Sequence, residues 1–252
     1  MMIEVIILSV VQGITEFLPV SSSAHLILIA KYFKFNSGSL NLDVSLHLGS
    51  LLAILFYFKN ELFHFTKNKE LLLKIILSSL PVIIFGFFLI KLNLIDYFRN
   101  FKVIGWSTLI FGIFLYYCDK IKVKKSLNKD FNYMTALYIG FFQILALIPG
   151  VSRSGIIISG GRFLNFNRID SVKISFLLSI PTLSAASLFN IQQLIIQDNL
   201  NASLFNLIGV CISFLISYLT IKFLILFIQK FSLTIFVIYR VILGFVILNY
   251  AY

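Results

Sequence analysis

The sequence predicts an all-α polytopic membrane protein, and composition and hydropathy are the first two observations that predict it. Of the 252 residues, 59% are hydrophobic and only 12% are charged, and the mean hydropathy is +0.97. Soluble domains carry about 25% charged residues. Apolar windows of about 20 residues, the length that crosses the hydrocarbon core, follow one another with short loops between them. Residues 1–252 are therefore expected to form a single integral membrane domain.

The third observation is a polar cassette that occurs twice. Residues 18–24 read LPVSSSA and residues 148–155 read IPGVSRSG. Each cassette follows an apolar helix with one glutamine, Gln12 or Gln143, and leads into a short apolar stretch. Hydroxyls, arginine and broken backbone at membrane depth are tolerated where they line a protein cavity. The sequence therefore predicts an intramembrane polar site built from two halves.

Six segments are long enough to span the membrane. They are 42–58, 71–90, 101–117, 172–193, 204–228 and 233–251. Two other regions, 1–33 and 132–163, each combine a helix-length apolar stretch, a break and a stretch too short to span. Proline removes a helical donor and disfavours helix in the residue before it. Pro19 and Pro149 are thus expected to turn these regions into re-entrant helical hairpins.

Lys and Arg residues in the loops predict the orientation. With both hairpins re-entrant, one face collects Lys59, Lys67, Lys69, Lys120, Lys122, Lys124, Lys125, Lys129, Arg162, Arg168, Lys173 and Lys230, and the other collects Lys31, Lys34, Lys91, Arg99 and Lys102. The more basic face is expected to be cytoplasmic, which places both termini outside. The net charge of +11 is attributed to this asymmetry, and no nucleic acid partner is predicted.

Three spans separate the hairpins, so the first hairpin opens outward and the second inward. The chain then divides into two copies of a hairpin followed by three spans, residues 1–117 and 132–252, in opposite orientations. Such an inverted-topology repeat places its site near the bilayer midplane, at the interface between the repeats.

The first cassette supplies a carboxylate, hydroxyls and an imidazole. Gln12 and Glu16 are four residues apart and share a helical face. The break is expected to return four side chains to that face: Ser21, Ser22, Ser23 and His25. A carboxylate at membrane depth is a functional candidate by default. A serine near an imidazole is the simplest activated nucleophile, with the carboxylate as its orienter or as a metal ligand.

The second cassette has the composition of an anion site. Glycines such as Gly150 and Gly155 let backbone approach a ligand closely, and the amides of a helix amino terminus favour an anion. Arg153 adds a planar fork that matches phosphate oxygens, and Ser152 and Ser154 flank it. The two cassettes together predict phosphoryl transfer or phosphate-ester hydrolysis at the membrane.

At these residues the chain resembles the undecaprenyl-pyrophosphate phosphatases of bacteria, also called bacitracin-resistance proteins. Members carry Glu/Gln-x-x-x-Glu running into Phe-Leu-Pro-Val-Ser-Ser-Ser/Thr-Gly-His, matched by residues 12–25, and Pro-Gly-x-Ser-Arg-Ser-Gly-x-Thr, matched from Pro149 onward. The resemblance extends to residues 43–50 and 175–181. Two positions depart from the pattern, Ala24 in place of glycine and Ile157 in place of threonine.

The resemblance implies a hydrolase of the bacterial inner membrane. Its polyprenyl diphosphate substrate, undecaprenyl pyrophosphate, would lie among the membrane lipids and lose its terminal phosphate, which regenerates the monophosphate carrier for cell-wall synthesis. The site would face the outer side. Bacitracin would compete indirectly by binding the substrate. The oligomeric state stays open, with a homodimer as one option.

Roles follow for the named residues. Arg153, with the serines and amides beside it, would clamp the diphosphate and stabilise the transition state. Ser22 is the preferred nucleophile and His25 its base and later acid. The alternatives are His25 as nucleophile, or a water that it activates. Gln12 and Glu16 would hold a divalent cation, Mg²⁺ or Ca²⁺, that bridges to the diphosphate.

A transporter is the competing interpretation. Inverted repeats with broken helices are typical of secondary carriers, and this protein could flip the monophosphate carrier. A pure transporter needs a binding arginine but no nucleophile, so the set of Glu16, Ser22 and His25 favours the enzyme.

Overall fold

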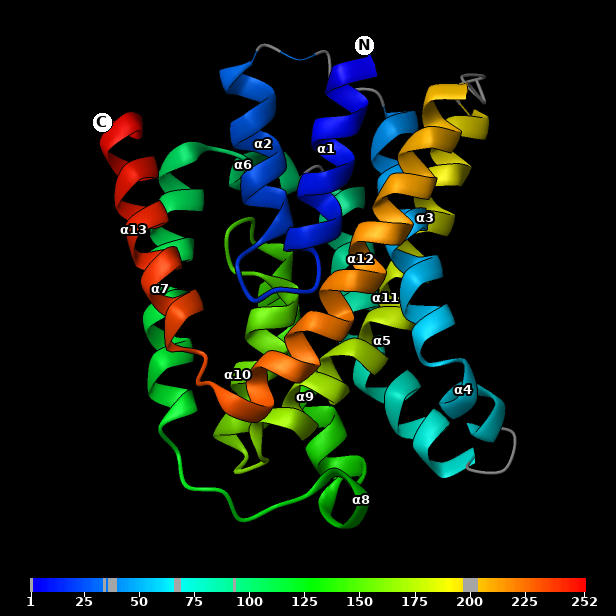
Figure 1. Ribbon diagram of the computed structural model, residues 1–252, viewed down its shortest axis with the longest axis vertical. Helices are drawn as coiled ribbons and strands as arrows, with labels where there is room; N and C mark the ends of the chain where they lie inside the picture. Colours follow the sequence, from blue (N-terminus) through cyan, green and yellow to red (C-terminus); the bar gives the residue numbers. More distant parts are fainter. Residues whose placement is uncertain (1, 34, 36–39, 66–68, 93, 197–203) are drawn as a thin grey trace.

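In the computed structural model the chain forms a bundle of helices (Figure 1), described for residues 2–33, 35, 40–65, 69–92, 94–196 and 204–252. In chain order the helices are α1 (Met2–Thr15), α2 (Ser22–Tyr32), α3 (Leu40–Tyr57), α4 (Lys59–Phe65), α5 (Lys69–Lys91), α6 (Ile95–Phe98), α7 (Phe101–Asp119), α8 (Leu127–Asp130), α9 (Tyr133–Ile144), the 3-10 helix η1 (Leu145–Leu147), α10 (Arg153–Phe163), α11 (Arg168–Ile196), α12 (Leu204–Lys230) and α13 (Thr234–Ala251). Two of the loop lysines, Lys34 and Lys67, lie outside the described residues.

The predicted all-α class is confirmed. Within the described ranges the only β-type pairing is one isolated bridge, between Lys125 and Phe166. Five helices are long and apolar enough to cross a membrane, namely α5, α7, α11 up to Gln193, α12 and α13. The sixth predicted span lies in α3, whose apolar part, Asn41–Tyr57, is shorter. The chain is thus a multi-pass membrane protein, and the count of six spans stays a prediction.

Both predicted breaks separate two antiparallel helices. In Figure 1, α1 and α2 extend from the end of the molecule that holds both termini down to its middle, and α9 and α10 extend from the opposite end up to its middle. Pro19 lies in the turn between α1 and α2, and Pro149 lies in the turn before α10. The other two prolines, Pro81 and Pro181, lie inside α5 and α11 without ending them.

Helices from the two halves of the chain pack against one another. The pairs in contact include α1 with α12, α5 with α9, α3 with α12, α5 with α11, α3 with α11, and α7 with α13. In two related halves, α1, α3, α5 and α7 would correspond to α9, α11, α12 and α13. Exchanging each helix for its counterpart turns the pair α1–α12 into α9–α5 and the pair α3–α12 into α11–α5. The pairs α3–α11 and α7–α13 are unchanged by the exchange. This exchange pattern is the one that a twofold-related repeat produces.

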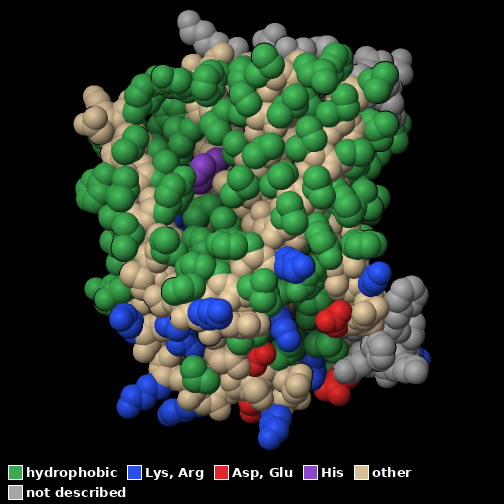
Figure 2. Space-filling view, in the orientation of Figure 1, with side chains coloured by type: hydrophobic (Ala, Val, Ile, Leu, Met, Phe, Trp, Pro, Cys, Tyr) green, Lys and Arg blue, Asp and Glu red, His purple; other side chains and the backbone are tan. Residues whose placement is uncertain are grey.

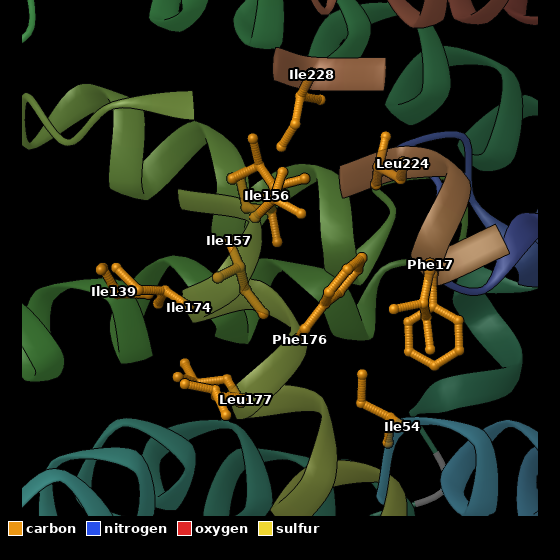
Figure 3. Close-up of a cluster of buried hydrophobic side chains, with 14 of the residues drawn as sticks. Phe17, Ile54, Ile139, Ile156, Ile157, Ile174, Phe176, Leu177, Leu224 and Ile228 are labelled. Atoms are coloured by element: carbon orange, nitrogen blue, oxygen red, sulfur yellow. The ribbon is translucent and has the colours of Figure 1, made fainter. Parts of the chain in front are cut away.

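The core lies beside the two breaks and draws side chains from both halves (Figure 3). Phe17, in the first break, packs edge-on against Phe176 of α11, with ring centroids 5.5 Å apart. Ile156 and Ile157 follow Arg153 on α10 and are fully buried in the same cluster. Burial of these side chains therefore fixes the position of the polar residues next to them.

Charged side chains gather at the end of the molecule opposite the termini. Figure 2 shows Lys, Arg, Asp and Glu over this end and mainly hydrophobic side chains over the rest of the visible face. A buried carboxylate, that of Asp119, links several elements at this end of the molecule. It accepts two hydrogen bonds from Arg168, at 2.7 and 2.9 Å. Asp119 also forms an ion pair with Arg162, at 3.6 Å, and accepts from the backbone N–H of Leu233 at 3.3 Å, which ties α7 to the start of α13.

Candidate active site

The two breaks are built alike. Ser21 and Ser152 both have positive φ, 77° and 71°, and each is the N-cap of the helix that follows. Ser21 Oγ accepts from the N–H of Ala24 at 3.4 Å, and Ser152 Oγ accepts from the N–H of Gly155 at 3.1 Å. A positive φ is uncommon for serine and costs free energy. Its occurrence at the same place in both hairpins marks these turns as a shared structural device.

The breaks meet at Glu16. Ser22 and Arg153 occupy equivalent positions, each directly after the serine with positive φ. The side chains of Ser22 and Arg153 both contact the Glu16 carboxylate. Ser22 Oγ donates to Oε2 at 2.6 Å, and Arg153 Nη2 donates to Oε1 at 2.8 Å. Gln12 Nε2 adds a bond to Oε2 at 3.0 Å. The structure thus places Gln12, Glu16, Ser22 and Arg153 in one cluster across the interface between the halves.

Arg153 is held on three sides. Besides Glu16, its guanidinium donates to Thr182 Oγ1 at 2.9 Å and to the carbonyl of Ser179 at 3.2 Å, both on α11. The Glu16 and Arg153 side chains are only 6% and 16% exposed. A buried ion pair of this kind needs good geometry and further hydrogen bonds to offset desolvation, and Thr182 and Ser179 supply them. The guanidinium is therefore preorganised before any ligand arrives.

A cavity of about 400 Å³ adjoins this cluster. Its polar lining comprises Glu16, Ser21, Ser22, Ser23, His47, Gln143, Ser152, Arg153, Thr182 and Asn190. Its apolar lining comes mainly from α5 and α11 and includes Val82, Ile83, Phe87, Ile90, Leu183 and Phe189. A cavity lined by both a polar cluster and many apolar side chains suits an amphiphile that has a charged headgroup and an apolar chain.

The structure places His25 away from this cavity. Its Nδ1 bonds to the carbonyl of Ser21 at 2.6 Å, and its Nε2 bonds to the hydroxyl of Tyr239 at 2.5 Å. The two rings also stack, with centroids 5.6 Å apart. Both ring nitrogens are therefore occupied, and the expected contact between Ser22 and His25 is not formed. The partner of Ser22 is Glu16 instead.

Several predicted binding groups face the protein and do not line the cavity. Gly150 has φ 95° and lies against α7, where the added carbon of an alanine would meet Ser107 and the carbonyl of Ile104. Gly155 lies against the guanidinium of Arg240, and its N–H is taken by Ser152. Ser154 Oγ donates to the carbonyl of Leu18 at 2.8 Å. These two glycines were expected to let the backbone approach a ligand closely. In the structure they instead allow close packing against α7 and against Arg240.

The two departures from the family pattern are both buried. Ala24 is 0% exposed and packs with Ile104 and Ile247. Ile157 is also 0% exposed and lies in the core shown in Figure 3. The hydroxyl that Ile157 lacks would therefore point into the core, away from the cavity.

Four polar cavity residues were not assigned from the sequence: His47, Gln143, Thr182 and Asn190. His47 Nδ1 bonds to the carbonyl of Asp43 at 2.8 Å, one turn earlier in α3. A signal existed for two of them, because His47 lies in the family-like stretch 43–50 and Gln143 is the counterpart of Gln12. Thr182 offers no such signal, since hydroxyls are common in helices of this kind.

Arg240 of α13 supports both breaks from behind and was also missed. It is fully buried, and its Nη2 donates to the carbonyls of Gly150 and Val151 at 2.9 and 2.8 Å. Its Nη1 reaches the carbonyl of Pro19 at 3.4 Å. One guanidinium thus binds carbonyls from the first and the second break, groups that lack helical partners because the helices end there.

The predicted cation would need oxygen ligands from the cluster around Glu16. The described residues contain no group of three or more His, Cys, Asp or Glu side chains able to hold a metal. Both oxygens of Glu16 accept hydrogen bonds, whereas the buried Oε1 of Gln12 has no hydrogen-bond partner among the described residues. Mg²⁺ is commonly bound by one or two protein oxygens together with water and substrate phosphates. The residues fit a cation held in this way.

Comparison with known proteins places the chain in a family. A model of the family described as "Bacitracin resistance protein BacA" matches residues 5–246. The chain belongs to this family. A protein of Pelagibacter ubique (strain HTCC1062) named "Undecaprenyl-diphosphatase" is 52% identical over 246 residues, covering 97% of this chain and 96% of the relative. Proteins with the same name from Campylobacter curvus (40% identical, covering 96% of each chain) and Jannaschia sp. (36% identical, covering 98% and 97%) also match. The BacA match includes both breaks and the whole Glu16 cluster.

Proposed function

We propose that this chain hydrolyses undecaprenyl diphosphate to undecaprenyl phosphate and inorganic phosphate. One observation carries the proposal: a serine, a carboxylate and an arginine are hydrogen-bonded together in a cavity whose remaining lining is mainly hydrocarbon. The diphosphate would lie against Arg153 and the serines, and the isoprenoid chain would lie along α5 and α11. The activity named for the relatives in the BacA family is the same reaction.

Ser22 is the proposed nucleophile, with Glu16 as its base. The Ser22 hydroxyl already donates to Glu16 Oε2 at 2.6 Å, so its proton would pass to the carboxylate as Oγ attacks the terminal phosphorus. The bond from that phosphorus to the bridging oxygen breaks, and undecaprenyl phosphate leaves. Water then attacks the phosphoserine and releases phosphate, and Ser22 regains its proton. His25 has no direct role in this scheme.

Arg153 would stabilise the charge that develops on the transferred phosphoryl group. Its planar fork is already oriented by Thr182 and Ser179, so little reorganisation is needed during the reaction. A divalent cation, Mg²⁺ or Ca²⁺, is proposed to neutralise the diphosphate, with Gln12 Oε1 and Glu16 as its protein ligands.

For the topology we propose six spans and two re-entrant hairpins, with both termini and the site opening on the outer side of the bacterial inner membrane. The exchange pattern of the helix pairs supports two inverted repeats, 1–117 and 132–252. The positions of the termini and of the charged side chains at opposite ends support the orientation (Figures 1 and 2).

The test is phosphate release by the purified protein in detergent. Undecaprenyl diphosphate should yield inorganic phosphate and undecaprenyl phosphate, and a chelator should abolish the reaction until Mg²⁺ or Ca²⁺ is restored. Glu16→Gln should be inactive with or without added cation. Tight binding of undecaprenyl phosphate without any phosphate release from the diphosphate would instead support the transporter.

A further inference from the structure

Gln143 is a buried polar side chain of the cavity that the proposed chemistry does not use. It lies on α9 at the end that meets the second break, and it is 0% exposed. Neither its Nε2 nor its Oε1 has a hydrogen-bond partner among the described residues, although Gln143 lines the cavity. A buried amide without partners is costly, because it has given up its bonds to water.

Comparison with Gln12 shows why Gln143 is unpaired. Gln12 precedes Ser21 by the same number of residues as Gln143 precedes Ser152, so the two glutamines are counterparts in the two breaks. Gln12 donates to Glu16 at 3.0 Å. Leu147 occupies the position that corresponds to Glu16, so the second break has no carboxylate for its glutamine.

The cavity beside Gln143 indicates the missing partner. Arg153, Ser152 and Thr182 line the same cavity, and all of them can donate hydrogen bonds. Ala146 and Leu147, which follow Gln143 in the chain, also line this cavity and are apolar. A buried amide that shares a cavity with several donors, and whose two N–H groups have no acceptor among the described residues, suits an anionic oxygen supplied by a ligand.

We propose that Gln143 is a substrate-binding residue. Its N–H donates to a non-bridging oxygen of the diphosphate, opposite the side held by Arg153, and its Oε1 accepts from a bound water. This inference rests on the proposed function and adds a phosphate contact from the second repeat that has no equivalent in the first, where the matching glutamine is committed to Glu16.

Steady-state kinetics with Gln143→Met test the proposal, because methionine keeps the length of the side chain and removes both polar atoms. Loss of a hydrogen bond to a charged group predicts a KM for undecaprenyl diphosphate raised about tenfold to a hundredfold, with a smaller change in kcat. Gln143→Glu keeps an acceptor and replaces the donor with a negative charge, so its KM should rise further.

Thermal unfolding separates binding from a structural role. Without ligand, Gln143→Met should unfold at the parental temperature or higher, because the unpaired amide is gone. Inorganic pyrophosphate with Mg²⁺ should stabilise the parent and fail to stabilise this variant. Gln229→Met, an exposed position near the far end of α12, is the matched control and should match the parent in both assays.

Parental KM values in both Gln143 variants would overturn the proposal, as would a lowered unfolding temperature of Gln143→Met with undiminished stabilisation by pyrophosphate. If the parent itself releases no phosphate, the proposed function fails. The pyrophosphate measurement then still decides whether Gln143 binds a diphosphate.

Discussion

Glu16 is the residue on which both halves of the chain converge. It accepts hydrogen bonds from Gln12 and Ser22 of the first half and from Arg153 of the second. These three donors stabilise the negative charge of the buried carboxylate by replacing the hydrogen bonds that water would otherwise supply. Because the same carboxylate orients the arginine and the serine, changes at any of these side chains are expected to act through the others.

Arg153→Lys should retain the charge and lose the fork that bonds Glu16 and Thr182 together. The expected loss is about 2–4 kcal/mol of transition-state stabilisation, the range found for a removed donor of this kind. Phosphate release under saturating substrate measures it, and Arg99→Lys, at an exposed position, is the control. A lysine enzyme as fast as the parent would show that Arg153 is not the clamp.

Ser22→Ala should abolish most turnover, whereas His25→Ala should retain most of it, because His25 bonds to Ser21 and Tyr239 outside the cavity. The double variant Glu16→Gln, Ser22→Ala should be little worse than either single variant, since residues that act as one unit are strongly non-additive. Rates at equal expression decide. An active Ser22→Ala enzyme would favour direct attack by water, and an inactive His25→Ala enzyme would restore the imidazole to the mechanism.

At the scale of the elements, the two breaks depend on helices that are distant in sequence. Ser107 of α7 donates to the carbonyl of Pro149 at 2.6 Å, and Thr108 donates to that of Gly150 at 3.4 Å. Arg240 of α13 bonds carbonyls of both turns. The pair α7 and α13 therefore acts as a support for the irregular backbone, which membrane interiors tolerate only when it is buried in protein.

Gly150→Ala should destabilise the second break. The added carbon would meet Ser107 and Ile104 in a backbone conformation that alanine rarely adopts, so we expect a loss of about 1–3 kcal/mol from overpacking alone. The control is Gly209→Ala in α12, where the nearest atoms are 3.5 Å away. Thermal unfolding in detergent compares them, and equal unfolding temperatures for the two variants would contradict the packing argument.

Arg240→Met should weaken both turns at once, since the carbonyls of Pro19 and Val151 lose this donor and that of Gly150 keeps only the longer bond from Thr108. An unsatisfied buried group costs about 1–3 kcal/mol. The unfolding temperature and the rate of phosphate release should therefore fall together. Arg240→Lys, which can still donate, should recover part of the loss. Parental stability in the methionine variant would show that the guanidinium does not support the breaks.

At the scale of the whole molecule, both termini lie at one end and the charged loops lie at the other (Figures 1 and 2). An even number of crossings is required for this arrangement. Five helices are long and apolar enough to cross, and in the proposed topology the sixth crossing is α3, the remaining apolar helix outside the hairpins. Its length, 17 residues from Asn41 to Tyr57, is at the lower limit for a span.

Cysteine labelling tests this topology. The exposed Cys211 and the buried Cys118 are first replaced, and single cysteines are then introduced as Lys124→Cys and Tyr252→Cys. A membrane-impermeant reagent should label position 252 in intact cells and position 124 only in inverted vesicles. Labelling of both positions from the same side would mean an even number of crossings between residues 124 and 252, where we propose three, and the arrangement of spans and hairpins would need revision.

The sequence by itself determined the features that depend on local chemistry. Hydropathy set the all-α membrane class, and Pro19 and Pro149 with their serines set the two breaks, because proline and capping hydroxyls act within a few residues. The same cassettes singled out Glu16, Ser22 and Arg153. Each of these inferences uses a spacing or a composition that is visible along the chain.

Only the tertiary structure decided which side chains meet. His25 bonds to Tyr239, Ser22 bonds to Glu16, Gly150 packs on α7, and the amide of Gln143 has no hydrogen-bond partner in the part of the chain that the structure describes. Arg240, which bonds both breaks, is far from each of them in sequence. Such contacts depend on which helix packs beside which, and no periodicity along the chain encodes that choice. The physical reason is that a polar side chain in a membrane bundle finds its hydrogen-bond partner on whichever helix packs against it. That helix is often distant along the chain.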